Sequence, residues 1–204
     1  MTFLDATTPY PWPYDGCLDP ERLALVIAGA QTAWQQASWG AAAALARITE
    51  VAYALREAGI LVVHLQHERV AGARPTRFPP AARTTDGDLV MVPGPGDLVV
   101  RATGIDGFHG GPLNDELRRR RIDHLVLAGF GAEVCVDSTL RSANDRGYEC
   151  LTLIDAVAPF SADLGRHALS SITMSGGIFG AIGPSASLLS ALSHARPPVS
   201  MEAQ

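Results

Sequence analysis

The sequence predicts a single-domain α/β fold, a three-layer α/β/α sandwich built around a mainly parallel sheet. Short apolar runs alternate with helical patterns along the whole chain, which is typical of a sheet with helices on both faces. The 204 residues are 47% hydrophobic and 18% charged, enough for one core but too few for two comfortable domains. Residues 123–155 also form one strand–turn–helix–strand unit, whose right-handed crossover requires parallel strands.

The first part of the chain predicts an arm, a strand, a helix and a second strand. Residues 1–20 contain four prolines with aromatic side chains between them, a stiff arm that packs on its own domain or on a neighbouring subunit. Leu23–Ala28 is a continuous apolar run and predicts a buried strand. Ala41–Ala58 is an Ala-rich helix that Gly59 ends, and Ile60–His64 is the second strand.

The middle of the chain is dominated by one long segment without regular structure. Residues 66–96 carry five prolines and no period, which is typical of a loop that borders a site or is mobile. Asp97–Arg101 predicts the third strand, and residues 103–111 a glycine-rich turn. Pro112–Arg121 predicts a helix opened by its proline, and its four terminal arginines complement the helix dipole.

The last part of the chain contains the central unit and three further elements. His124–Ala128 predicts a buried strand, a helix follows from about Glu133 to Gly147, and Cys150–Ile154 is the next strand. The remaining elements are a helix over Ser161–Met174, a short strand over Gly177–Ala181 and a helix over Ser185–Ser193. The boundaries predicted are an arm over 1–20, one domain over 21–193 and a flexible tail over 194–204.

Cys135 is the first candidate for chemistry. It lies in the first turn of a helix at the carboxyl end of a parallel strand, where open α/β sheets bind ligands. The amides and the dipole of a helix start favour a thiolate over a thiol. If Cys135 attacks a carbonyl, the N–H groups of Gly131 and Cys135 are natural donors to the oxyanion. The alternative is a small apolar side chain at a helix–sheet contact.

The segment around Cys135 carries the patterns Gly129-x-Gly131-Ala132-x-Val134-Cys135-Val136-x-Ser138-Thr139 and Ala143-x-x-Arg146-Gly147-Tyr148. It resembles the nucleophile segment of the isochorismatase-like cysteine hydrolases. Residues 9–16 and 175–180 resemble biuret-hydrolase-type members, so the resemblance covers roughly residues 9–193. It implies an isochorismatase-like fold, a homo-oligomer (dimer or tetramer), and a nucleophile that cleaves a C–N bond of a small amide or ureide through a thioester.

Two catalytic positions of the resembled family are altered. The family aspartate at the end of the first strand falls at Gly29, in the register given by Gln31. The family lysine falls at Ala102, in the register given by Phe108. Arg101 is adjacent but points to the opposite face of a strand, and its guanidinium does not shuttle protons near neutral pH. Losing one general base commonly costs about 10²–10⁴ in rate.

The sequence therefore predicts a divergent or pseudoenzyme member that acts on or binds a small molecule. The alternative is an active cysteine hydrolase with a relocated base, for which the candidates are Asp106, His109, Glu133 and His64. A glutamine of biuret-type members is replaced by Ser175. Further candidates for the pocket are Gln31, Arg101, Phe108 and Phe130.

Charge and composition exclude several other functions. Sixteen basic against 21 acidic residues give a net charge of −5, and no basic stripe exists beyond Arg118–Arg121, so nucleic acid is not expected as a partner. Gly129-x-Gly131 lacks the third glycine of dinucleotide sites, because Val134 stands there. His64-x-x-His67 has no third ligand at metal-binding spacing, so no metal and no cofactor are expected.

The cellular setting and the assembly are also expectations. Three cysteines without a signal peptide are typical of the reducing cytoplasm, and no apolar stretch is long enough to span a membrane. A non-catalytic subunit that forms a hetero-oligomer with an active relative is a further possibility that the altered positions leave open.

Overall fold

A computed structural model of the protein describes residues 2–68 and 88–195. Its centre is one six-stranded sheet of order β3-β2-β1-β4-β5-β6, in which all neighbouring strands are parallel. The strands are β1 (Leu23–Ala28), β2 (Leu61–Glu68), β3 (Leu98–Thr103), β4 (His124–Phe130), β5 (Glu149–Ala158) and β6 (Ala181–Gly183). The parts of the predicted loop and tail that fall on 69–87 and 196–204 lie outside the described residues.

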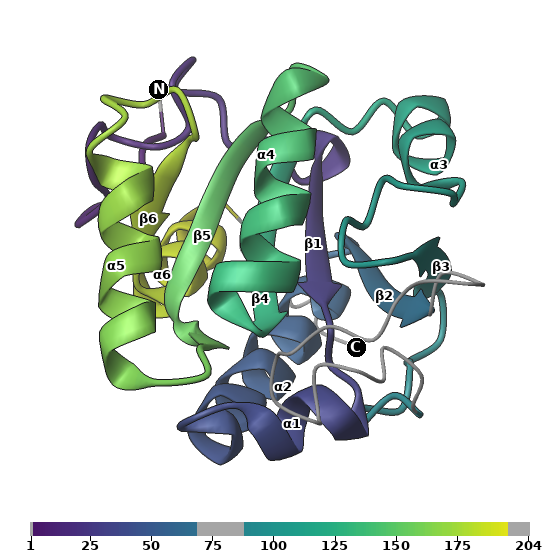
Figure 1. The fold of residues 1–204 in the computed structure, drawn as a ribbon. Coiled ribbons are helices and arrows are strands. Elements are labelled where there is room, and N and C mark those ends of the chain that lie inside the picture. The colour runs from purple at the N-terminus through teal and green to yellow at the C-terminus, as the bar shows by residue number, and fades with distance from the viewer. Residues whose placement is uncertain (1, 69–87, 196–204) are drawn as a thin grey trace, which may run out of the picture.

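Helices cover both faces of this sheet, so the predicted three-layer sandwich is confirmed. α4 and α5 lie on one face, and α2 and α6 lie on the other (Figure 1). The α-helices are α1 (Thr32–Ala37), α2 (Ala41–Glu57), α3 (Leu113–Arg119), α4 (Asp137–Asp145), α5 (Ala162–Thr173) and α6 (Ser185–Ala195). A 3₁₀ turn, η1 (Pro20–Arg22), precedes β1, and a π-helical turn, η3 (Ala132–Val136), precedes α4. No helix of the described ranges is long and apolar enough to cross a membrane.

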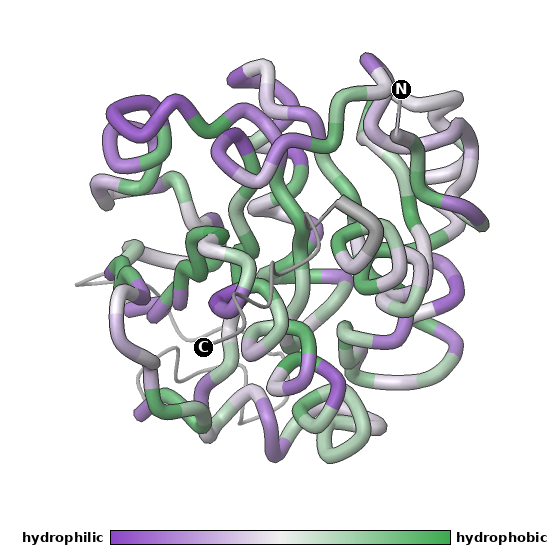
Figure 2. The backbone as a smooth tube through the Cα atoms, turned by 180° about the vertical axis from the view of Figure 1, so that it is seen from behind, coloured by the Kyte–Doolittle hydropathy of each residue, from purple (hydrophilic) through white to green (hydrophobic). Residues whose placement is uncertain are grey.

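The core is centred on the two middle strands. Every residue of β1 and of β4 is buried, because helices cover both faces of these strands. Figure 2 shows the same distribution, with mainly hydrophobic residues through the middle of the molecule and hydrophilic segments at the periphery. Gly59 and Gly147 follow the ends of α2 and α4 with φ of 74° and 79°, as the sequence predicts for helix-ending glycines.

Several predicted boundaries are wrong, each for a local reason. β2 continues to Glu68 rather than ending at His64, because the polar side chains His64 and His67 are buried and hydrogen-bonded inside the protein. β6 begins at Ala181, since Gly177 and Gly180 adopt φ of 105° and 84° and form a turn instead of the predicted strand.

Other elements are longer, shorter or additional. α6 extends to Ala195, two residues into the predicted tail, and β5 spans Glu149–Ala158 instead of Cys150–Ile154. α3 is confined to Leu113–Arg119. The short helix α1 has no counterpart in the sequence prediction, because its six residues show no apolar period.

The amino-terminal arm packs on its own domain. Thr8 pairs antiparallel with Ile182 of β6 through two backbone hydrogen bonds of 3.0 and 2.8 Å. Trp12 is completely buried and Leu4 is 2% exposed. The arm thereby covers the edge strand of the sheet, which would otherwise present unpaired backbone groups.

Candidate functional site

The turn after β4 positions Cys135. Gly131 has a φ of 62° and reverses the chain, and its carbonyl oxygen accepts hydrogen bonds from the amides of Val134 and Val136 at 2.8 and 3.4 Å. Cys135 follows within the π-helical turn η3 rather than in the first turn of a regular α-helix. Such turns widen the backbone by one residue and occur frequently at functional sites.

Gly29, the position predicted for the family aspartate, faces the sulfur of Cys135. A Cβ built on Gly29 would lie 3.3 Å from the Cys135 Sγ and 3.1 Å from the carbonyl oxygen of Phe130. The backbone of Gly29 has a φ of 65°, which other residues adopt only with strain. The end of β1 therefore approaches the thiol with backbone alone and offers it no proton acceptor from a side chain.

The environment of Cys135 favours the protonated thiol. The side chain is fully buried, and burial, followed by the charge of Glu133, raises the pKa of Cys135 well above its ordinary value. Glu133 holds its position because its Oε1 accepts a hydrogen bond of 2.9 Å from the Phe160 amide. Among described groups its Oε2 is buried without a hydrogen-bond partner. Burial and this carboxylate thus oppose the expected effect of the helix dipole.

Helix α1 covers the turn that the sequence predicts as an oxyanion hole. The amide of Gly131 donates a hydrogen bond of 3.3 Å to the Ser38 hydroxyl just after α1. A Cβ on Gly131 would lie 3.0 Å from the ring of Trp34, and that ring stacks on Phe160 at 5.7 Å between centroids. The Trp34 Nε1 is buried with no partner among the described residues. Trp34 and Ser38 are neighbours of the site that sequence reasoning missed, because α1 itself was not predicted.

The predicted lysine position and its neighbour point in different directions. Ala102 is 1% exposed and pairs in register with His67 of β2. Arg101 points away, with 71% of its side chain exposed, and donates a hydrogen bond to Glu68. The alternation along β3 therefore keeps the guanidinium out of the buried face.

Three of the four proposed replacement bases are either hydrogen-bonded to other groups or exposed. Asp106 accepts hydrogen bonds from the Ser142 hydroxyl at 2.5 Å and from the Phe108 amide at 2.9 Å. His64 is fully buried against Asp97, with 2.7 Å between Nε2 and Oδ2. His109 is exposed. Glu133 is the remaining candidate, and it is the carboxylate that acts on the pKa of Cys135.

The other pocket candidates have packing roles in this structure. The amide group of Gln31 spans the backbone of His67, accepting from its N–H at 2.8 Å and donating to its carbonyl at 3.1 Å. Phe108 packs against Tyr148, near the far end of α4 from Cys135. Ser175 donates to the Ile172 carbonyl at 2.7 Å in the turn after α5. These contacts stabilise strand ends and turns, and Phe130 is likewise fully buried.

His67 is a buried polar residue whose environment the sequence did not indicate. Its Nδ1 lies 3.1 Å from the Gly104 carbonyl, whereas its Nε2 has no partner within the described ranges. Burial lowers the pKa of His67 to about 4, so the ring is neutral at pH 7. The sequence prediction ended this strand at His64 and so left His67 in the following loop, and its spacing from His64 was considered only as a metal-binding motif that lacks a third ligand.

Comparison with known proteins places this site in a family context. A family profile described as the isochorismatase domain matches residues 23–182. A streptothricin hydrolase from Streptomyces noursei is 38% identical over 105 residues, which cover 52% of this chain and 40% of that protein. A ureidoacrylate amidohydrolase from Variovorax paradoxus is 35% identical over 143 residues, 57% of each protein. The chain thus spans about half the length of the curated relatives it matches.

Solved structures share the fold at lower identity. A cysteine hydrolase from Pseudomonas syringae pv. phaseolicola superposes with a TM-score of 0.73 at 22% identity, covering 88% of this chain and 96% of that one. An isochorismatase family protein from Burkholderia thailandensis gives 0.73 at 25% identity, covering 86% and 97%. The two curated relatives are named for streptothricin and ureidoacrylate, so the comparisons support the superfamily but not the predicted biuret-type subdivision.

Proposed function

The chain belongs to the isochorismatase family, and we propose that it is a divergent member that binds a small amide or ureide at Cys135 without cleaving it through a thioester. The observation that carries this proposal is the position of Gly29. Its missing Cβ would lie 3.3 Å from the Cys135 sulfur, so the place from which a carboxylate would take the thiol proton holds no side chain.

The chemistry of thioester formation supports this reading. The thiol proton must leave Sγ while negative charge builds on the substrate carbonyl oxygen. The raised pKa of Cys135 keeps the thiolate fraction small, and the neighbouring charge of Glu133 acts against the thiolate. Ser38 already accepts the Gly131 N–H that would stabilise the oxyanion. A missing base alone commonly slows such a step by about 10²–10⁴.

Two unsatisfied polar atoms indicate the kind of molecule that fits. Trp34 supplies a buried N–H donor and Glu133 a buried carboxylate acceptor, each without a partner in the described part of the chain. Both residues contact Phe160, through ring stacking and through a hydrogen bond to its amide. Buried polar atoms of this kind ordinarily have a partner. A small neutral amide or ureide carries both a carbonyl and N–H groups, so it offers the kind of partner that each of these atoms lacks.

One observation favours a second function, that of an active amide hydrolase. The buried and unpartnered Oε2 of Glu133 belongs to the carboxylate that acts on Cys135, so it is the natural replacement for the family base. In that case Glu133 would remove the thiol proton, and the reaction would proceed through the thioester with water as the second nucleophile.

Alkylation of the cysteines against pH tests the proposal directly. With iodoacetamide and mass spectrometry on the folded protein, Cys135 should react at least about tenfold more slowly than the exposed Cys17 at pH 7.5, because its thiol is protonated and buried. Cys150, also fully buried, is the reference for limited access. If Cys135 reacts faster than Cys17, and its apparent pKa lies below about 8.5, the proposal is wrong.

Replacement of Glu133 distinguishes the two functions, because one predicts faster alkylation of Cys135 and the other a loss of hydrolytic activity. If Glu133 only opposes the thiolate, Glu133→Gln removes a negative charge and should raise the alkylation rate of Cys135 severalfold at fixed pH. If Glu133 is a base, the variant should instead lose about 10²–10⁴ in amide-hydrolysing activity. Asp145→Asn, an exposed change at the end of α4, is the control and should alter neither.

A further inference from the structure

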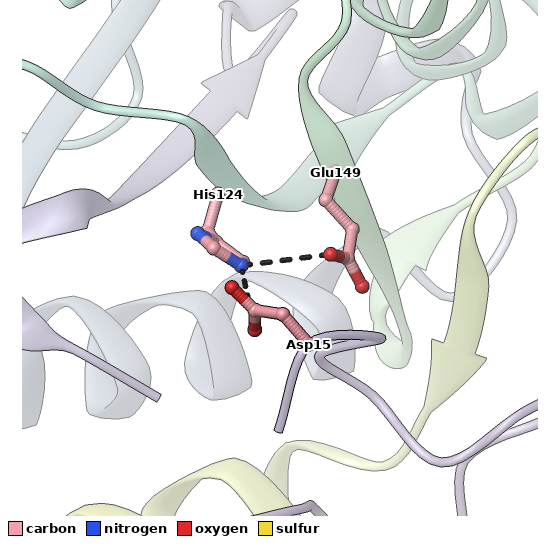
Figure 3. Close-up of side chains that lie close together, drawn as sticks. All are labelled: Asp15, His124 and Glu149. Atoms are coloured by element: carbon pink, nitrogen blue, oxygen red, sulfur yellow. Dashed lines mark ion pairs between the residues drawn. The ribbon is translucent and has the colours of Figure 1, made fainter. Parts of the chain in front are cut away.

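A second cluster of polar side chains lies at the amino-terminal ends of strands β4 and β5, opposite the end of the sheet that carries Cys135. His124 is the first residue of β4 and Cys135 follows the end of that strand, which separates the two regions by about 20 Å at 3.3 Å per residue. His124 is 4% exposed, although it is a polar residue at a strand terminus. Asp15 reaches it from the amino-terminal arm and Glu149 from the start of β5 (Figure 3).

The imidazole of His124 is oriented by one carboxylate and points at two others. Asp123 lies 2.5 Å from Nδ1, and as an acceptor it holds the ring proton on that nitrogen. Nε2 points between the carboxylates of Asp15 and Glu149, at 3.6 and 3.5 Å (Figure 3). In the described part of the protein Nε2 is buried without a hydrogen-bond partner. A neutral imidazole would aim a lone pair at two negative groups, so the arrangement calls for positive charge at Nε2, supplied either by a proton or by a metal ion.

The distances fit a metal ion better than a hydrogen bond. Hydrogen bonds to nitrogen are about 2.7–3.2 Å long, and both separations exceed that range. Two ligand atoms bound to a tetrahedral zinc ion at about 2.1 Å lie about 3.4 Å apart. The three ligand atoms of Asp15, His124 and Glu149 all lie within 4.8 Å of one another. This set supplies one nitrogen and two oxygens and leaves a fourth position for water.

The charges and supporting contacts agree with this assignment. Asp15, Asp123 and Glu149 place three negative charges around the ring, and the guanidinium of Arg22 pairs with Asp15 and Asp123. With a neutral His124 ring, two negative charges are left, and one divalent ion neutralises them. The contact of Asp123 with Nδ1 is the carboxylate–histidine pair that commonly orients metal-binding imidazoles. The amides of Cys17 and Tyr14 donate to Asp15 and Glu149 and hold both carboxylates in place.

We propose that Asp15, His124 and Glu149 bind a divalent transition-metal ion of the zinc class at the amino-terminal ends of β4 and β5. Because Asp15 belongs to the arm and the other two ligands begin β4 and β5, the ion would fasten the arm to the two strands. Imidazole together with carboxylates suits zinc, whereas magnesium prefers oxygen ligands alone and retains its water. The site is separate from Cys135 and does not depend on the function proposed for it.

Calorimetric titration with zinc chloride at pH 7.5 tests the proposal on the full chain carrying Cys17→Ser. That background is needed because the exposed Cys17 thiol lies two residues from Asp15 and would bind zinc by itself. We expect one ion per chain and no binding of magnesium. Asp15→Asn, His124→Gln and Glu149→Gln should each weaken binding about a hundredfold, and Asp123→Asn about tenfold. Asp163→Asn, an exposed carboxylate on α5, is the matched control and should bind as the parent does.

A second measurement keeps the test decisive if a variant fails to fold. Cobalt bound to the Cys17→Ser chain with all three ligands intact should give the visible absorption of a nitrogen- and oxygen-ligated ion, without the thiolate charge-transfer band that a cysteine ligand produces. No zinc binding, binding that persists within about threefold in all three ligand variants, or a thiolate band would each overturn the proposal. In the first case Nε2 carries a proton in place of the metal.

Discussion

Gly129→Ala is expected to destabilise the protein by about 4 kcal/mol or more, or to prevent folding altogether. Gly129 has a φ of 137°, and a Cβ built on it would lie 1.9 Å from the backbone oxygen of Ala28. Ala28 and Gly129 are register partners in the pairing of β1 with β4 at the centre of the sheet. The clash involves backbone that no side-chain rotation relieves, so the strands themselves must separate. Urea denaturation followed by circular dichroism measures the loss.

Gly147→Ala is the matched control for this prediction. Gly147 also has a positive φ, of 79°, but a Cβ on it meets no atom within 4 Å. We therefore expect a loss of only about 1 kcal/mol, the cost of the left-handed conformation alone. Equal losses for the two variants would show that backbone conformation, and not the contact between β1 and β4, accounts for the effect at Gly129.

Asp97→Asn is expected to cost about 3 kcal/mol at pH 7. The Asp97 side chain is 1% exposed and accepts hydrogen bonds from Arg56 at 2.6 and 2.8 Å and from the Gly94 amide at 2.8 Å. His64, whose pKa is lowered by burial, also donates to it through Nε2 at 2.7 Å. Removing one partner of a buried ion pair costs about 3–5 kcal/mol. We take the lower end, because the Arg56 side chain is 22% exposed and remains partly solvated.

The same carboxylate predicts how stability depends on pH. Burial raises the pKa of Asp97, but the hydrogen bonds from Arg56, His64 and Gly94 outweigh it and hold the pKa below its ordinary value. The folded protein therefore binds this proton less readily than the unfolded chain. The stabilisation is present above the unfolded pKa of about 3.9 and is lost as the pH falls through the lower folded value.

Urea denaturation between pH 7 and pH 2 checks both statements about Asp97. The parent protein should approach the stability of Asp97→Asn as the pH falls below about 4. Asp163→Asn, at an exposed pair with 76% of the aspartate side chain accessible, should stay within about 0.5 kcal/mol of the parent at neutral pH. Parallel curves for the parent and Asp97→Asn down to pH 2 would mean that Asp97 contributes nothing through its charge.

The fold and the placement of Cys135 could be predicted from the sequence because their signals are local. Leu23–Ala28 and His124–Ala128 are apolar runs that only a strand buried on both faces explains, and both lie in the centre of the sheet. The glycines after helices α2 and α4 end these helices because they adopt a positive φ, a property of glycine itself that requires no contact with a distant residue. Gly29 could be assigned by its register to Gln31, and the structure brings it against the thiol.

Tertiary structure decided which polar side chains meet. The sequence could not indicate that Ser38 accepts the Gly131 N–H, or that Trp34 covers the same turn, because Trp34 lies in a short helix without apolar period and Ser38 directly follows that helix. It also could not bring Asp15, His124 and Glu149 together, since they come from three separate elements. Apolar periodicity and glycine conformations depend on residues that are close together in the sequence, so they can be recognised from the sequence alone. Hydrogen bonds and charge pairs form between distant residues, so they exist only once the sheet has assembled.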